Sequence, residues 1–346
     1  MKKQKKMGTK AKNLKVLGVC AGGGALLYPF RRQLIGNIEP RTAFKNPNNE
    51  QWKLNFGDIP LINEYQLGNF DKVDIILSSP DCGASSTMRL SLKKVLGEPK
   101  NNKSINLVIA SIQYYKPKLF LIENLPRLLS FISDKQFQEL FPDYRLVYHE
   151  CSVLEYGNSQ ASRKRLVIIG INKNTAREYL NSFDKVFKVD TPKYSRDILE
   201  LPKKEFGMIP KDKVLAMYDY RLLPKKINLT VQQIHDLWIK DFKDEKKWPI
   251  KTAKMSTLPG VYRLENDKYP LTVRPADRQF RPDGWPLSIE DMKNLMGFPK
   301  RFKVYGLSSK NKREYQYWLN KARYTLCKGS VYQVGKWFKK CLVTTI

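Results

Sequence analysis

The sequence predicts an α/β protein with a parallel, helix-covered sheet and a second, smaller domain. From residue 14 to 171, short apolar runs alternate with polar stretches long enough for helices, which is typical of such sheets. From about 172 to 265 this rhythm is replaced by lysine clusters and prolines. Regular structure resumes with a capped helix pattern over 285–299. The predicted strands are KVLGVC, QLIGNIE, KVDIILSS, KPKLFLIEN, YRLVYHE and RLVIIGI.

Charge and length restrict the class of partner. With 346 residues the chain can bury a substantial core, and its formal net charge of +30 favours a polyanionic partner, of which nucleic acid fits best. No apolar run reaches the roughly 18 residues of a membrane-spanning helix, so we expect no membrane partner. Residues 1–15 hold seven lysines and no apolar stretch, which indicates a basic arm rather than a signal peptide.

Cysteine and histidine usage argues against a metal site. The five cysteines show no CxxC spacing, and there are only two histidines. An odd number of cysteines without a signal peptide indicates free thiols in a reducing cytoplasm. One thiol is therefore available for chemistry.

The residues that follow the predicted strands point to a nucleoside cofactor. Ligands of open parallel sheets bind beyond the carboxyl ends of the strands. The first strand runs into Gly22, Gly23 and Gly24, where missing side chains let a ligand approach the backbone, and Glu39 ends the next run, where it could hold ribose hydroxyls. Asp58 could accept a hydrogen bond from an adenine amino group, although a plain surface aspartate is an equal alternative. The sequence has neither a P-loop nor a complete GxGxxG, which disfavours nucleotide hydrolysis and hydride transfer.

Two further strand ends carry a nucleophile and an acid. Cys82 follows the apolar run over 73–77 beside Ser, Asp and Gly, which favours a reactive thiol over a buried one. Glu123 directly follows another apolar strand, where a partly desolvated carboxyl group can keep a proton and give it to a base, although a helix cap is the alternative. We expect both side chains at the same edge of the sheet.

This ordered set of motifs resembles the cytosine-C5 DNA methyltransferase family, with its glycine loop, Pro-Pro-Cys, Glu-Asn-Val and Gln-x-Arg-x-Arg motifs. The block over 156–170 is similar to the family's Tyr-Gly-Val-Pro-Gln-Asn-Arg-Glu-Arg, with one extra residue between Gln160 and Arg163. The resemblance spans 14–171, returns after about 269, and implies a Rossmann-like S-adenosylmethionine-dependent methyltransferase fold with a smaller target-recognition domain.

The resemblance also implies a division of the chain into four parts. These are a basic N-terminal arm (1–13), a catalytic domain (14–175), a target-recognition domain (176–265) and a return segment whose C-terminal helix completes the catalytic domain (266–346).

The implied chemistry is methyl transfer from S-adenosylmethionine to C5 of a cytosine flipped out of double-stranded DNA, without a metal. Cys82 would add to C6 while Glu123 protonates N3. Arg165 would hold the cytosine O2 and Arg163 a backbone phosphate, although the two arginines could instead form a simple phosphate clamp. The implied cofactor contacts are Val19, Gly22, Gly23, Gly24, Glu39, Asp58, Pro80 and Lys328.

Three departures from the family pattern leave alternatives open. Val19 replaces an aromatic residue against adenine, Asp81 replaces the second proline of Pro-Pro-Cys, and Lys328 stands on or beside the usual Asn of the closing block. The chain could therefore be a catalytically impaired DNA-binding homologue. Lys328 could also pair with the carboxylate of carboxy-S-adenosylmethionine, giving 5-carboxymethylcytosine, whereas the simpler alternative has Lys328 pointing away or binding a phosphate.

The same motifs occur in a branch of the family that acts on transfer RNA, and the positive charge does not distinguish the two nucleic acids. We expect a monomer acting on DNA in the cytoplasm of a bacterial host. Compact size and divergent motifs suggest a phage or mobile element, with a role in restriction-modification. The target sequence depends on loops of the second domain and cannot be read from these motifs.

Overall fold

The computed structural model divides into two compact units. The first comprises residues 1–158, 162–191 and 328–346, and the second comprises 159–161 and 192–327. The residues that the structure describes are 13–40, 48–81, 103–160, 163–198, 233, 261–263, 278–280, 287, 289–304 and 331–344.

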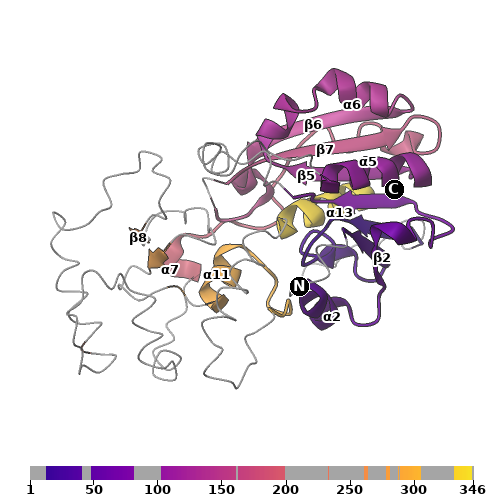
Figure 1. Ribbon diagram of the computed structural model, residues 1–346. Helices are drawn as coiled ribbons and strands as arrows, with labels where there is room; N and C mark the ends of the chain where they lie inside the picture. The colour runs from indigo at the N-terminus through magenta and orange to yellow at the C-terminus, as the bar shows by residue number, and fades with distance from the viewer. Residues whose placement is uncertain are drawn as a thin grey trace, which may run out of the picture. The chain divides into compact units, whose positions relative to one another are not determined.

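A seven-stranded sheet forms the centre of the first unit (Figure 1). Its strand order is β3-β2-β1-β4-β5-β7-β6, and the neighbours from β3 to β5 are parallel. β7 is antiparallel to both β5 and β6. The strands are β1 (Val16–Val19), β2 (Leu34–Glu39), β3 (Leu61–Asn63), β4 (Ile75–Ser78), β5 (Leu119–Asn124), β6 (Tyr144–Ser152) and β7 (Lys164–Asn172).

The α/β class predicted from the sequence is confirmed, and the expectation of a parallel sheet is wrong at β7. Each of the six predicted runs contains a strand, whereas the short strand β3 was not predicted. β6 and β7 are joined by the 3-10 helix η5 (Val153–Tyr156) and a short loop. A parallel neighbour needs a crossover of a dozen or more residues, so this short connection requires an antiparallel pair.

One face of the sheet is covered by α5 (Lys103–Tyr115) and α6 (Asp134–Leu140), as Figure 1 shows. Alternate strand residues, such as Leu17, Ile76 and Phe120, join one buried cluster with the apolar side of α5 and with Phe137 of α6. This apolar stripe at helical spacing explains why α5 forms against the sheet.

The opposite face packs against the 3-10 helix η1 (Tyr28–Phe30) and the C-terminal helix α13 (Tyr332–Thr344). Val16, Phe30 and Leu342 line one small cavity there. Gly335 permits close contact, because an added Cβ would lie 2.2 Å from the carbonyl oxygen of Leu26. α13 therefore belongs to the unit that contains the sheet.

The remaining described elements of the first unit are α2 (Asn48–Phe56), η3 (Glu64–Gln66), η4 (Pro126–Ser130) and η6 (Arg177–Tyr179). In the second unit, β8 (Val261–Arg263) pairs in parallel with β9 (Arg278–Phe280), and α7 (Ser195–Ile198) contacts α11 (Ile289–Leu295). α11 lies within the helix predicted over 285–299. Within the described ranges, no helix combines the length and apolarity needed to cross a bilayer.

Candidate active site

Several of the predicted site residues lie where the parallel strands end, at what we call the strand-end edge. Glu39 ends β2, Ser79 follows β4, and Glu123 lies near the end of β5. Because β7 is antiparallel, its first residues lie at this same edge, and Leu166 pairs with Asn124. The reversed strand thus brings Arg165 beside the ends of its neighbours.

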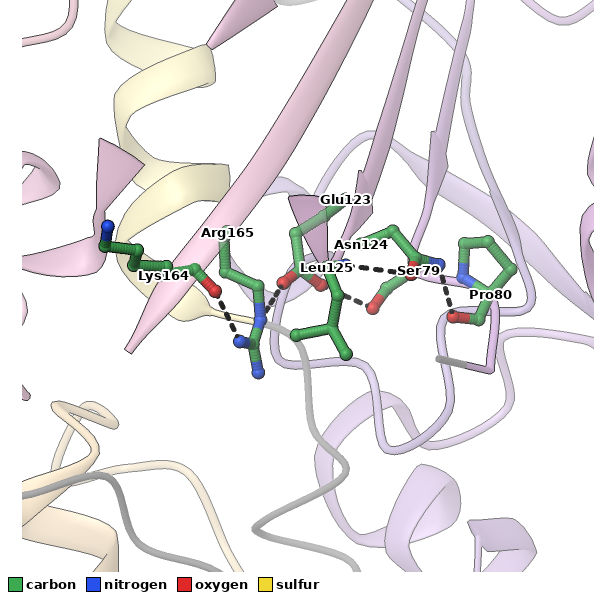
Figure 2. A network of polar contacts seen from close by, with 7 residues as sticks. All are labelled: Ser79, Pro80, Glu123, Asn124, Leu125, Lys164 and Arg165. Atoms are coloured by element: carbon green, nitrogen blue, oxygen red, sulfur yellow. Dashed lines mark hydrogen bonds and ion pairs between the residues drawn. The ribbon is translucent and has the colours of Figure 1, made fainter. Parts of the chain in front are cut away.

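Glu123 is held on both carboxylate oxygens (Figure 2). The hydroxyl of Ser79 donates to Oε2 at 2.6 Å, and Nε of Arg165 forms an ion pair with Oε1 at 2.7 Å. The side chain of Glu123 is 3% exposed and that of Arg165 is 12% exposed. Two partners and near-complete burial fix the orientation of this carboxyl group, as proton transfer to or from a substrate base would require.

Asn124 connects the end of β5 to the segment that leads toward Cys82. Its amide Nδ2 donates to the carbonyl oxygen of Pro80 at 3.1 Å, as drawn in Figure 2. The backbone N–H of Asp81 donates to the hydroxyl of Ser104 at 3.0 Å. These bonds fix the chain up to Asp81, and Cys82 itself lies outside the described residues.

The three cysteines that the structure describes are poorly suited to nucleophilic chemistry. Burial raises the pKa of Cys20 well above its usual range. Burial also raises the pKa of Cys151 to about 11 and that of Cys341 to about 12. Since the thiolate is the reactive form, the raised pKa disfavours each of these three thiols as a nucleophile near neutral pH.

A second cluster surrounds the glycine turn after β1. Oε1 of the buried Glu39 accepts hydrogen bonds from the backbone N–H of Gly22 at 2.6 Å and from Nδ2 of Asn37 at 2.9 Å. Burial raises the pKa of Glu39 to about 7, although the hydrogen bonds from Asn37, Gly22 and Ala21 act in the opposite direction. A carboxylate held in this way can accept further bonds from ligand hydroxyls when it is ionised.

The glycines of this turn have different surroundings. Gly22 has a φ of +57°, and an added Cβ would meet no atom within 4 Å. Gly24 has a φ of +81°, and a Cβ there would lie 2.3 Å from the ring of Phe56. Gly24 therefore permits packing within the protein, whereas Gly22 leaves space that a ligand can occupy. Open space beside a buried carboxylate fits the ribose end of an adenosine cofactor.

The other predicted site residues are less closely associated. Val19 is fully buried in β1, and Asp58 is exposed in the turn after α2. Arg163 is 3% exposed, and its carbonyl oxygen accepts from the N–H of Val153. Lys328 lies outside the described residues. The structure thus pairs Glu123 with Arg165, links the adjacent Asn124 to Pro80, and joins Gly22 to Glu39.

Sequence reasoning missed several supporting residues. Ser79 was noted only as a neighbour of Cys82, although its hydroxyl is bonded to Glu123. Asn37, two residues before Glu39, has the alternation that places both side chains on one face, a signal that could have been used. Asn158 donates to Gln333 of α13 at 2.9 Å, a contact between distant parts of the sequence that no local pattern predicts.

No group of three or more potential metal ligands occurs in the described portion of the chain. A protein-family model described as "C-5 cytosine-specific DNA methylase" matches residues 37–317. The matched range includes Glu39, Cys82, Glu123 and Arg165, and it excludes both the glycine turn and Lys328.

Individual relatives are distant. The chain is 23% identical over 301 residues to type II methyltransferase M.Bpa9945I of Bacillus paralicheniformis, which covers 80% of this chain and 64% of that protein. A solved E. coli structure, described as a DNA modification methyltransferase encoded within a prophage, has 16% identity and a TM-score of 0.59, covering 96% of this chain and 99% of that one. The S. pombe Dnmt2 methyltransferase has 13% identity and a TM-score of 0.58, covering 96% and 99%. These structural likenesses support the fold.

Proposed function

The chain belongs to the C-5 cytosine-specific DNA methylase family, and from this premise we propose that it methylates C5 of cytosine in double-stranded DNA with S-adenosylmethionine as the donor. The observation that carries the proposal is the buried carboxyl group of Glu123, held by Ser79 and Arg165 at the strand end next to the segment that leads to Cys82. An oriented acid whose neighbour Asn124 is bonded to Pro80, two residues before Cys82, suits addition to a cytosine ring.

In the proposed reaction the thiolate of Cys82 forms a bond to C6 of cytosine while Glu123 gives a proton to N3. The electron pair of the C5–C6 bond would become available at C5, which would take the methyl group as the bond between that carbon and the donor's sulfur breaks and S-adenosylhomocysteine leaves. Solvent water would take the C5 proton, the bond between Cys82 and C6 would break to return the thiolate, and N3 would give its proton back to Glu123, which restores the aromatic ring. When bound, S-adenosylmethionine supplies an electrophilic methyl group.

The substrate base has to leave the stacked duplex, because C6 cannot be reached inside it. We assign Arg165 to the O2 atom of the flipped cytosine, since its Nε already orients Glu123 at the same edge. Arg163 would contact a backbone phosphate. Its near-complete burial means that this contact requires either the tip of the guanidinium group or a rearrangement on binding.

The cofactor would be held by the glycine turn and by Glu39, with Asp58 at the adenine and Pro80 on the methyl-donor side. The space over Gly22 supports this assignment. Lys328, on or beside the position of the family's Asn, would decide between donors if its ammonium group lies in the pocket, where it would favour carboxy-S-adenosylmethionine. Competition between the two donors tests this, and equal preference in wild type and Lys328→Asn removes the carboxymethyl alternative.

The decisive experiment is mass analysis of nucleosides from duplex DNA and from transfer RNA, each incubated with the protein and S-adenosylmethionine. We expect 5-methylcytosine in DNA. Modified RNA alone would transfer the proposal to RNA methylation, and no product in either would favour a binding protein without turnover. Cys82→Ser should abolish product while DNA binding persists, and 5-fluorocytosine at the target should trap wild type covalently.

The biological role of the proposed methylation depends on whether the enzyme recognises one fixed DNA sequence. One relative is named a type II methyltransferase, and we propose that this chain likewise modifies a fixed short DNA sequence within a restriction-modification system. Mapping of modified cytosines should then show one recurring sequence, read by the region of 176–265. Methylation scattered without a common sequence would contradict this role.

A further inference from the structure

The opposite edge of the sheet, where the parallel strands begin, carries a row of basic side chains. Strand register aligns Leu34, Val16, Ile75, Leu119 and Ile171 across five neighbouring strands. Residues just before the first four positions and just after β7 therefore share one edge, which we call the strand-start edge. Its basic residues are Lys15, Arg31, Arg32, Lys72, Lys116, Lys118 and Lys173.

Most of this positive charge faces solvent, and acidic residues offset only part of it. Of the seven basic side chains, all but Lys118 are exposed. Four acidic residues are nearby: Asp74 is buried and paired with Lys118 at 3.3 Å, while Asp71, Asp143 and Glu178 are exposed. Within the described residues, no ion pair is formed by Lys15, Arg32, Lys72 or Lys116.

α13 adds further positive charge beside this edge. Nζ of Lys339 donates to the carbonyl oxygen of Pro29 at 2.6 Å and to Oε1 of Gln33 at 3.2 Å. Burial, followed by the charges of Arg31 and Arg32, lowers the pKa of Lys339. Crowded cations oppose the folded state unless an anion neutralises them, so the arrangement favours an anionic ligand.

The spacing of these charges fits a nucleic-acid backbone. Neighbouring strands lie about 4.8 Å apart, so the row over five strands is about 20 Å long. A duplex presents one phosphate charge per roughly 1.7 Å of its axis and can face such a row continuously. Tyr114, 59% exposed, precedes Lys116 by two residues at the end of α5 and adds an aromatic surface at this edge.

We propose that the strand-start edge is a second DNA-binding surface, which holds the phosphate backbone of a duplex segment other than the one that enters the strand-end edge. The two edges lie at opposite ends of the same strands, so one protein molecule contacts two segments. The surface retains the enzyme on long DNA between encounters with target cytosines. The choice of DNA over RNA, and the existence of another DNA-binding surface at the strand-end edge, rest on the proposed function. The contact between the strand-start edge and a phosphate backbone does not.

The test compares two variants that each lose three positive charges. The edge variant is Arg32→Gln/Lys72→Gln/Lys116→Gln. The matched control is Lys53→Gln/Lys135→Gln/Lys185→Gln, which removes exposed lysines elsewhere in the same unit. Each protein is mixed with an immobilised duplex and a fluorescent duplex, both built only of A·T pairs, and co-capture of the fluorescent duplex measures bridging.

We expect wild type and control to bridge the duplexes, and the edge variant to lose bridging at least tenfold. Its log affinity for the second duplex should depend less steeply on log salt, by about three in slope. Methylation of a short cytosine-containing duplex should be unchanged in both variants. Equal bridging by edge and control variants, with matched thermal unfolding, overturns the proposal, as does an edge effect seen only with RNA or with anionic vesicles.

The A·T duplexes separate this proposal from the proposed function, because they cannot be methylated at cytosine. If wild type bridges duplexes, the edge variant does not, and neither forms methylcytosine, the second DNA-binding surface is supported and the proposed enzymatic function is overturned. If wild type methylates DNA fully but does not bridge duplexes, the enzymatic function is supported and the second surface is overturned.

Discussion

The strand-end edge and the strand-start edge of the sheet differ in how their charged groups are held. At the strand-end edge, Glu39 and Glu123 are 5% and 3% exposed, and each accepts at least one hydrogen bond within the protein. At the strand-start edge, side chains such as Arg32 and Lys116 are exposed and make no ion pair among the described residues. Buried and bonded groups have one orientation, whereas exposed cations act at a distance and are screened by salt. Catalytic chemistry needs buried groups with one orientation, whereas contact with a phosphate backbone needs only exposed cations.

This difference predicts that carboxyl groups at the two edges respond unequally to the same substitution. Glu123→Gln should lower single-turnover methylation by about a hundredfold or more, because the positioned acid is lost while shape is retained. Glu178→Gln, in the turn after β7, is the matched control and should leave the rate unchanged. Similar rates for the two variants would assign Glu123 a structural role.

The next largest effect concerns pH and the buried Glu39. Burial raises its pKa from 4.5 to about 7, so the carboxyl group is largely protonated in the folded protein below neutral pH. If ribose hydroxyls donate to the ionised form, cofactor affinity should rise with pH through about 7 and be about tenfold weaker at pH 6 than at its plateau. Calorimetric titration from pH 6 to 8.5 measures this, and Glu39→Gln should flatten the profile.

The same carboxyl group also makes the stability of the fold depend on pH, and here the sign is opposite, because stability falls as pH rises. Between pH 4.5 and about 7 the folded state binds more protons at Glu39 than the unfolded state does. Its contribution to stability is therefore fully present below pH 4.5 and is lost as pH rises through about 7. A cofactor affinity that falls with rising pH over this window would contradict the role assigned to the carboxylate.

A smaller effect is expected at Ser79, which holds the second oxygen of Glu123. Ser79→Ala removes one hydrogen bond of about 1 kcal/mol, equivalent to roughly a fivefold loss in turnover. Ser79→Thr keeps a hydroxyl and should restore the rate. Because the lost bond acts on the carboxyl group, the pH profile of turnover should shift in Ser79→Ala, with KM for DNA unchanged. A loss of equal size in both variants would indicate packing instead.

The fold could be predicted largely from sequence because its strands are short, apolar and separated by helices. Strands such as β5, which ends at Asn124, are fully buried and carry a strong local signal. β3 has three residues, of which only Ile62 is buried, so it has too little periodicity to detect. The reversal of β7 depends on the length of the preceding connection, which apolar runs alone do not report.

Sequence reasoning could select candidate site residues that lie at the end of a strand. It could not identify the partners that these residues contact on neighbouring strands. The rule that ligands bind at strand ends selected Glu39 and Glu123. Their partners could not be derived, because the bond from Ser79 to Glu123 spans 44 residues and depends on the pairing of β4 with β5. The positions of Cys82 and Lys328 stay predictions from the sequence.

The smallest catalytic effect is expected from Asp74, the one buried carboxylate described at the strand-start edge. It accepts from the backbone N–H of Lys15 at 3.0 Å and pairs with the partly exposed Lys118 at 3.3 Å. Asp74→Ala leaves that N–H unbonded and should lower the free energy of unfolding by about 2 kcal/mol, mostly through the lost hydrogen bond, since solvent screens the ion pair.

Methylation of a short duplex by Asp74→Ala should stay at the wild-type rate below the unfolding transition, because the side chain lies a full strand length from Glu123. Chemical denaturation with the exposed Asp71→Ala as control separates the two edges: the control should change stability by less than about 0.5 kcal/mol. If Asp74→Ala instead lowered turnover as strongly as Glu123→Gln while remaining folded, the two edges would be coupled, and the division between a bonded chemical edge and an exposed binding edge would fail.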